Sequence, residues 1–198
     1  MRGQVITLLM FFLIGCSDNK TMEKHPLDKS KERKIILENG LKVYLLSDPN
    51  FNMSSASMSV MVGSLEDPSD RQGLAHFLEH MLFLGTKKYP DVDEYGKYLK
   101  TNGGYSNAYT ARDHTNYHFQ VLPDGFEGAI DRFSQFFIEP LFTEEYTERE
   151  VNAVDSEHKN YLMNDSWRSF QVSNLFVKDN HPARNFNVGN LEPLGDIK

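Results

Sequence analysis

The chain has 198 residues and a formal net charge of −7, with 39% hydrophobic, 25% charged and 12% aromatic residues. This length suits one domain with a hydrophobic core, and fourteen Phe and nine Tyr argue against a disordered chain. The net negative charge gives no sign of a nucleic-acid partner, so we expect none. A single cysteine excludes an intramolecular disulfide framework and a cysteine-rich metal site, so the seven histidines become the first candidates for metal or proton chemistry.

Residues 1–15 have the pattern of an export signal. Arg2 is the only charged residue among them, and the run from Val5 to Ile14 is apolar apart from one threonine. This run is about half of the ~20 residues that a transmembrane helix needs. The run ends in Leu13-Ile14-Gly15-Cys16, which resembles the lipobox of bacterial lipoproteins. The alternative is an ordinary signal peptide with an incidental cysteine.

The lipobox resemblance implies that the signal is removed and that Cys16 is acylated at the mature N-terminus. Two or more acyl chains give stable membrane anchoring. Ser17 resembles the sorting signal for the outer membrane. We therefore expect a lipid-anchored protein in the cell envelope of a Gram-negative bacterium, on the outer membrane and facing the periplasm. Residues 16–33 are polar and contain Pro26, and we interpret them as a tether between the lipid and a domain at 34–198.

The domain is expected to begin with a β-hairpin. Ile35–Leu37 and Leu41–Leu46 are apolar runs on either side of Asn39-Gly40, a pair typical of tight hairpin turns. The next elements are expected to be a strand at 56–62, helices at about 73–84 and 91–101, and strands at about 105–110 and 114–122.

Two further helices are expected towards the C-terminus. Asp124 is expected to cap a helix that runs to about residue 137, and Thr143 is expected to begin a long helix. After Trp167 the pattern weakens, because prolines and glycines interrupt it. Hairpins mixed with helices indicate an α+β fold, in which helices pack on an antiparallel or mixed sheet.

The segment 73–84 carries a compact group of polar residues. A helix over this segment is apolar nearly all round, which is typical of a buried helix. At about 100° per residue, His80 lies about 40° from His76 and Glu79 about 60° on the other side, so all three share one face. Two imidazoles four residues apart can bind one zinc ion, and His-x-x-Glu-His is the inverted zincin signature. The alternative is a pair of core histidines that bond to backbone carbonyls.

A third metal ligand is expected from another element, because a catalytic zinc usually has three protein ligands. The long helix places Glu150 and Glu157 on its apolar, core-facing side, whereas Glu145 and Glu148 lie on the solvent side. His158 is ambiguous, and packing or a hydrogen bond is its plainer role.

These motifs together resemble the pitrilysin/insulin-degrading enzyme family of zinc metalloendopeptidases, and the similarity covers about residues 34–190. The segments that carry it are His76-Phe-Leu-Glu79-His80, Arg149-Glu150-Val-Asn-Ala-Val-Asp-Ser-Glu157-His, Ser106-Asn107-Ala108-Tyr109-Thr110, His114-Thr-Asn-Tyr and Met163-Asn164-Asp165-Ser166-Trp167-Arg168. The resemblance implies a fold similar to the N-terminal domain of pitrilysin-type peptidases.

The resemblance also implies roles for individual residues. His76, His80 and Glu157 would bind Zn²⁺, Glu79 would be the catalytic general base, and Glu150 would be a supporting acid. The edge strand that binds the substrate backbone would contain Ser106, Asn107, Ala108 and Tyr109. The implied function is hydrolysis of peptide bonds in oligopeptides or small unfolded proteins, by a zinc-activated water with Glu79 as the base.

Two alternative functions share features of this sequence. S-ribosylhomocysteine lyases also carry His-x-x-Glu-His, but their third metal ligand is a cysteine, and the only cysteine here precedes the domain. The second alternative is a non-catalytic or partner-dependent chain that binds zinc and peptide without efficient turnover. Family enzymes are built from two homologous halves, each longer than this chain, and the sequence stops at Lys198. We therefore expect a truncated piece, or a C-terminal half or partner chain that completes it.

Overall fold

The computed structural model describes residues 24–197. The chain divides into two compact units, residues 1–50 and 51–198. The predicted export signal, the predicted lipidation site Cys16 and the first part of the predicted tether lie outside the described residues. Within residues 24–197, no helix combines the length and the apolar character that crossing a membrane requires.

The first unit contains the predicted hairpin. Strands β1 (Lys31–Ile36) and β2 (Lys42–Ser47) pair antiparallel, from Ile36 opposite Lys42 to Lys31 opposite Ser47. The turn has Gly40 at φ +85°, a conformation that a residue without Cβ adopts freely, and the Asn39 side chain accepts a hydrogen bond from the Leu41 N–H. The hairpin prediction is confirmed. The ladder extends three residues into the segment that we interpreted as a tether, because cross-strand pairing continues to Lys31.

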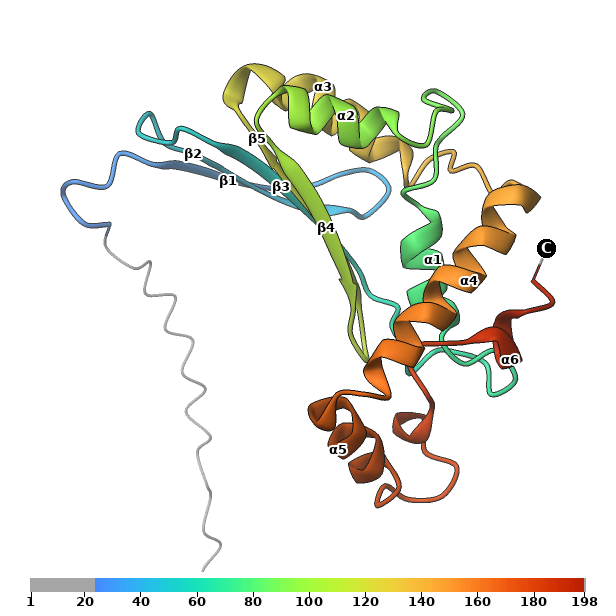
Figure 1. Ribbon diagram of the computed structural model, residues 1–198. Helices are drawn as coiled ribbons and strands as arrows, with labels where there is room; N and C mark the ends of the chain where they lie inside the picture. The colour runs from blue at the N-terminus through green and yellow to red at the C-terminus, as the bar shows by residue number, and fades with distance from the viewer. Residues whose placement is uncertain (1–23, 198) are drawn as a thin grey trace, which may run out of the picture. The chain divides into compact units, whose positions relative to one another are not determined.

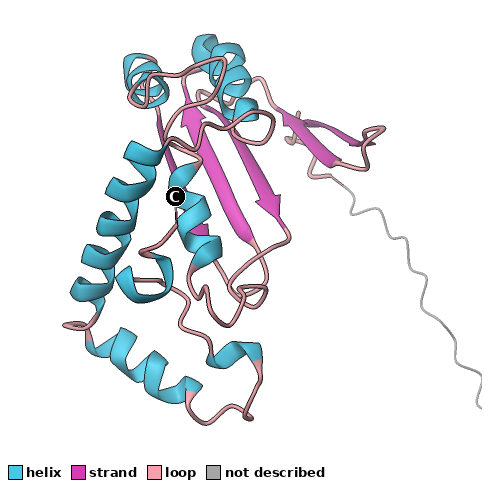
Figure 2. Cartoon of the chain, turned by 90° about the vertical axis from the view of Figure 1, so that its right-hand side faces the viewer, coloured by secondary structure: helices cyan, strands magenta, loops and turns pink. Residues whose placement is uncertain are grey.

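The second unit is built on a three-stranded antiparallel sheet in the order β3-β5-β4 (Figures 1 and 2). The strands are β3 (Ser54–Val60), β4 (Tyr105–Thr110) and β5 (Thr115–Val121). β5 is central, so one side of β4 forms an edge of this sheet. The expected strand at 105–110 is confirmed residue for residue, and both sheets in the described part are antiparallel.

Helices α2 (Glu94–Thr101) and α3 (Phe126–Gln135) cover one face of this sheet (Figure 1). Alternate residues of β5 point towards the two helices, as the period of two in a strand requires. This core consists of Leu82, Tyr95, Leu99, Tyr117, Phe119, Val121, Ala129, Phe133 and Phe136. Five of these nine side chains are aromatic.

A second core joins α1 (Leu74–Met81) to α4 (Glu144–Tyr161), two helices that lie side by side in Figure 1. The short helix α6 (Leu191–Leu194) packs against both. The buried members of this core are Phe77, Met81, Val151, Val154 and Leu194. Apolar packing therefore fixes the distance between α1 and α4.

Several predicted boundaries need correction. The helix α1 is shorter than 73–84, and it is not buried all round, because the Leu78 side chain is 44% exposed. Asp124 does not cap α3: it lies in a 3₁₀ turn, η1 (Pro123–Gly125), and Gly125 precedes the helix. The proline at the start of this turn explains the change, because its fixed φ favours a tight turn there. The helix ends at Gln135 instead of residue 137.

One helix was not predicted. α5 (Asp165–Asn174) follows α4 after a short break, and the Asn164 side chain accepts hydrogen bonds from the N–H groups of Ser166 and Trp167. The apolar side chain of Val172 is exposed on α5. This helix therefore lacks the pattern of apolar residues on the buried side and polar residues on the solvent side that identifies a helix in a sequence. A second 3₁₀ turn, η2 (Pro182–Arg184), leads towards α6.

Candidate metal centre

Helices α1 and α4 bring three side chains with metal-binding atoms together. His76 and His80 come from α1, and their Nε2 atoms lie 3.2 Å apart. Glu157 comes from α4, and its Oε2 atom lies 3.6 Å from each of these two nitrogens. The three ligand atoms all lie within 4.8 Å of one another. The structure thus brings together two of the predicted residues from one helix and the third from a distant part of the sequence.

The size of this triangle fits a single zinc ion. Two ligand atoms at about 2.0–2.1 Å from one tetrahedral zinc are roughly 3.3–3.4 Å apart, close to the observed separations. The donor set of two imidazoles and one carboxylate is also one that zinc accepts. The three residues are only half-buried, with side chains 14%, 25% and 31% exposed, so ligands and water have access to the centre.

Each histidine uses its other ring nitrogen in a separate hydrogen bond. The Nδ1 of His76 donates to the backbone carbonyl of Val188 at 2.8 Å, and the Nδ1 of His80 donates to the Glu150 carboxylate at 2.6 Å. Since both acceptors are oxygens, these bonds assign the proton to Nδ1 and leave the Nε2 lone pairs facing the centre. The residue predicted as a supporting acid, Glu150, therefore contacts a histidine and not the centre itself.

Burial and three nearby carboxylates shift the pKa of His80. Burial lowers the pKa of the imidazole, but the hydrogen bond and charge of Glu150, with the charges of Glu79 and Glu157, outweigh burial and raise it above its ordinary value. An acidic site of this kind attracts a cation.

Glu79 lies on α1 next to the histidines but does not belong to the triangle. Its side chain is buried, with only 7% of the residue exposed, and its Oε2 accepts a hydrogen bond from the Thr110 hydroxyl at 2.7 Å. Glu79 directly precedes His80 on α1, and its charge contributes to the raised pKa of both His80 and Tyr161. This position separates Glu79 from the three ligand atoms, as the helix geometry predicts.

Strand β4 carries the residues predicted to bind substrate. Ser106 and Ala108 are half-buried, whereas Asn107 and Tyr109 are exposed. The Tyr109 ring packs edge-on against His114 at a centroid distance of 5.6 Å. The strand ends at Thr110, the residue that bonds to Glu79, so the edge of the sheet leads directly to the candidate centre.

The N-terminus of α1 is fixed by a close backbone approach. Gly73 and Gly189 have φ angles of +88° and +85°, and a Cβ on Gly73 would lie 2.3 Å from the Cα of Gly189. This approach places the Val188 carbonyl next to His76. The buried Asp67 carboxylate accepts the N–H groups of Gly73 and Ala75, both at 2.8 Å, and so caps the helix. Burial raises the pKa of Asp67, although these two bonds oppose the shift.

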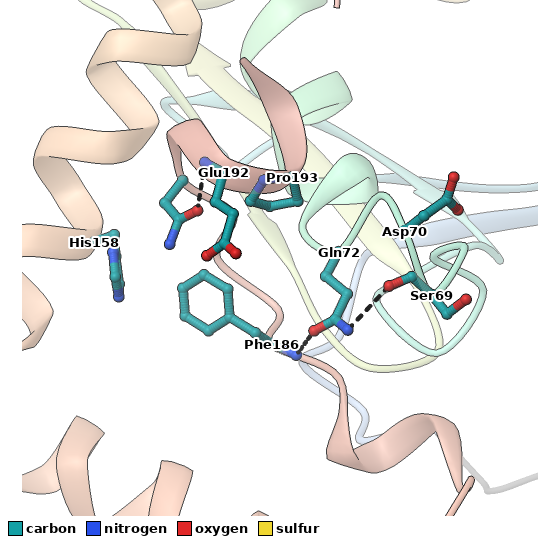
Figure 3. A pocket seen from close by; sticks show the side chains of 8 residues that line it. Ser69, Asp70, Gln72, His158, Phe186, Glu192 and Pro193 are labelled. Atoms are coloured by element: carbon teal, nitrogen blue, oxygen red, sulfur yellow. Dashed lines mark hydrogen bonds between the residues drawn. The ribbon is translucent and has the colours of Figure 1, made fainter. Parts of the chain in front are cut away.

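His158 does not join the metal-binding group. Its ring packs edge-on against Phe186 at a centroid distance of 4.7 Å, which is the packing role that we considered plainer. Figure 3 shows both side chains at the wall of a cavity of about 470 Å³. On the far side of that cavity, the Gln72 side chain accepts the Phe186 N–H at 2.7 Å, which ties the loop before Val188 to the start of α1.

Several residues at the centre were not identified from the sequence. Val188 contributes only a backbone carbonyl, which leaves no signature in side-chain chemistry. Thr110 stood at the end of the segment Ser106–Thr110 without an assigned role, and Tyr161 was not singled out. The weak signal for Tyr161 was its spacing of one helical turn from Glu157.

Comparisons with known proteins agree with this arrangement. The family model described as Insulinase (Peptidase family M16) matches residues 42–180. Insulin-degrading enzyme from Homo sapiens is 53% identical over 171 residues, which are 86% of this chain and 17% of that protein. A relative from Schizosaccharomyces pombe that is named as a zinc protease is 51% identical over 171 residues, 86% of this chain and 18% of that protein.

The fold has a counterpart among solved structures. The crystal structure of pitrilysin superposes with a TM-score of 0.82 at 43% sequence identity, covering 89% of this chain and 19% of that chain. The predicted similarity to pitrilysin-type peptidases and the α+β fold are thereby confirmed. The chain spans less than one fifth of the length of each of these three proteins. Zinc is the cofactor that both the donor set and the relatives indicate. On the strength of the matched segment and these identities, the chain belongs to the insulinase family, peptidase family M16.

Proposed function

We propose that this chain carries the zinc centre of a metalloendopeptidase and takes part in the hydrolysis of peptide bonds. The observation that carries this proposal is the convergence of His76, His80 and Glu157, whose ligand atoms all lie within 4.8 Å of one another. Membership of a peptidase family supports the same function. These three residues would hold the zinc ion.

Zinc, when bound, lowers the pKa of a water molecule towards about 7 and polarises the carbonyl of the peptide bond. Glu79 is the general base in this proposal. Glu79 directly precedes His80 on α1, and the Thr110 hydroxyl donates a hydrogen bond that orients its carboxylate. From there Glu79 accepts a proton from the attacking water and returns it to the leaving amine.

Glu150 has a supporting role in this proposal. It accepts the Nδ1 proton of His80 at 2.6 Å, and such a bond fixes both the orientation of the ring and the nitrogen that faces the metal. Glu150 therefore acts through His80 and does not bind zinc.

Strand β4 is the proposed binding edge for the substrate. In the described part of the chain, no other strand pairs with the outer edge of β4, so an extended peptide could pair with its backbone N–H and C=O groups as an added strand. The proposed contacts are made by Ser106, Asn107, Ala108 and Tyr109. Because backbone pairing is insensitive to side chains, the proposed substrates are oligopeptides or small unfolded proteins.

The proposal is tested with the full chain, purified with and without zinc. We expect about one zinc per chain by elemental analysis, and cleavage of an unstructured fluorogenic peptide that stops when a chelator is added. Glu79→Gln should keep the zinc and lose about 10²–10⁴-fold in cleavage rate, since the base is removed and the ligands are not. The double variant His76→Ala/His80→Ala should lose both zinc binding and peptide cleavage. Stoichiometric zinc in this double variant would contradict the assignment.

The same experiment distinguishes the second candidate function, zinc and peptide binding without efficient turnover. The relatives are five to six times longer than the stretch that they share with this chain. In this case the wild-type chain and Glu79→Gln would bind zinc equally and would cleave the peptide equally slowly. Addition of a C-terminal half from a longer relative would then raise the cleavage rate of the wild-type chain but not that of Glu79→Gln.

We also propose that the protein is anchored in the bacterial cell envelope by lipid on Cys16, on the periplasmic side of the outer membrane. This proposal rests on the sequence: Leu13-Ile14-Gly15-Cys16 resembles a lipobox, and Ser17 resembles the sorting signal for the outer membrane. Cys16→Ser should move the protein from the membrane fraction to a soluble or unprocessed form. Mass spectrometry of the wild-type protein should show diacylglycerol on Cys16, and a free thiol there would contradict the proposal.

A further inference from the structure

The two carboxylate oxygens of Glu157 face different partners. Oε2 lies 3.6 Å from the Nε2 atoms of His76 and His80. Oε1 accepts a hydrogen bond from the hydroxyl group of Tyr161, one helical turn further along α4. One oxygen therefore faces the two imidazoles, while the other is occupied by the phenol.

Tyr161 is itself fixed by a second helix. Its ring stacks on the ring of Trp167 in α5, with centroids 4.2 Å apart and an angle of 18° between the planes. Trp167 lies at the start of α5, where the Asn164 side chain accepts a hydrogen bond from its backbone N–H. Its ring packs edge-on against that of Phe170, with the centroids 5.9 Å apart. The phenol is thus held in place by the junction between α4 and α5.

The hydrogen bond has a defined direction. A carboxylate can only accept, so the Tyr161 hydroxyl donates. A tyrosine hydroxyl carries one proton and can therefore serve as this donor.

We propose that Tyr161 is a positioning residue for the third metal ligand, holding Oε1 of Glu157 so that Oε2 points at the two imidazoles. This inference rests on the proposed zinc centre. It completes a pattern in which each ligand has one outer partner: the Val188 carbonyl for His76, Glu150 for His80 and Tyr161 for Glu157. Outer partners of this kind commonly change metal affinity by about 10–100-fold when they are removed.

Tyr161→Phe is the direct test, because phenylalanine keeps the stack on Trp167 and removes only the hydroxyl. Zinc affinity of the full chain is measured by competition with a chromophoric chelator. We expect Tyr161→Phe to bind zinc about 10–100-fold more weakly than the wild type. Tyr146→Phe, which removes a hydroxyl from the same helix away from the centre, should stay within about threefold of the wild type. Circular dichroism of the metal-free proteins checks that both variants fold.

A double-mutant cycle separates positioning from a general structural effect. In a Glu157→Ala background the carboxylate is absent, so Tyr161→Phe should change zinc affinity by less than about twofold. A wild-type chain that binds no zinc would overturn the proposed centre and this inference together. A wild-type chain that binds zinc, with an unchanged affinity in Tyr161→Phe, would overturn the inference alone. The same loss of affinity in both backgrounds would also overturn it.

Discussion

Thr110 connects the strand proposed to bind substrate with the residue proposed as the base. It is the last residue of β4, and its hydroxyl donates to Glu79 at 2.7 Å. Directly opposite on β5, the Thr115 hydroxyl donates to the Val62 carbonyl at 2.9 Å and lies 3.4 Å from that of Thr110. The two threonines are paired across the sheet but have different acceptors.

We expect Thr110→Val to lower the rate of peptide cleavage by about tenfold or more while leaving zinc binding within about threefold of the wild type. Valine has the shape of threonine without the hydroxyl, so the carboxylate loses its orientation, and small misplacements of catalytic groups cost large factors in rate. Cleavage kinetics and chelator competition on the same preparation measure the two effects.

Thr115→Val is the matched control, since it removes a neighbouring hydroxyl that does not contact Glu79. It should destabilise the chain by about 1–3 kcal/mol because the Val62 carbonyl loses a partner, but it should change the cleavage rate much less than Thr110→Val. Equal loss of activity in the two variants would show that the hydroxyl of Thr110 has no specific role.

At the scale of elements, the start of α1 depends on backbone packing more than on side-chain chemistry. Gly73 precedes the helix with φ +88°, and it lies against the backbone of Gly189. Asp67, from the preceding loop, supplies the acceptors for the first N–H groups of the helix. The Gly73–Gly189 contact and the Asp67 hydrogen bonds therefore fix the start of the histidine-bearing helix.

Gly73→Ala should lower the free energy of unfolding by about 2–5 kcal/mol. The left-handed conformation costs a residue with Cβ about 1–2 kcal/mol, and the added carbon, 2.3 Å from a backbone atom, costs about 1–3 kcal/mol more. Gly96→Ala in α2 is the control. A Cβ there meets nothing within 4 Å, so the free energy of unfolding of this variant should rise by roughly 0.5–1 kcal/mol. Denaturant unfolding followed by circular dichroism compares the two, and a Gly73→Ala protein as stable as the wild type would refute the packing account.

The sequence was informative where periodicity or motif chemistry was strong. The strand at 105–110 and the long helix after Thr143 agree with the structure, because alternation and an apolar stripe mark them clearly. The donors His76, His80 and Glu157 were found from helix geometry and family resemblance, and the structure brings them together. Helix α5 has no such stripe, and tertiary contacts such as the Val188 carbonyl depend on a loop whose path no local pattern encodes.

At the scale of the molecule, the proposed zinc ion would join elements that are far apart in the chain. His76 and His80 belong to α1 and Glu157 to α4, and the whole centre lies within the second unit, residues 51–198. An ion that binds the folded chain and not the unfolded one stabilises the fold by mass action. The second unit is therefore expected to depend on zinc for part of its stability.

Removal of zinc should lower the thermal unfolding midpoint. Free zinc at 100 times its dissociation constant adds about 2.7 kcal/mol to the free energy of unfolding. For a chain of this length, this raises the unfolding midpoint by roughly 5–10 °C. Differential scanning calorimetry with and without a chelator measures this shift. The His76→Ala/His80→Ala variant should show the same midpoint in both conditions, and a wild-type midpoint that ignores the chelator would argue against a zinc centre.

The hydrogen bond between His76 and Val188 has a consequence for the order of events during biosynthesis. It joins residues 112 positions apart, and the bond between His80 and Glu150 joins residues 70 positions apart. Both histidines leave the ribosome long before their partners, so a growing chain presents two unsupported imidazoles and no third donor. Such distant contacts form late, because a long loop must close first. Tight retention of the metal would therefore begin only after the segment around Val188 has been made and has folded back onto α1.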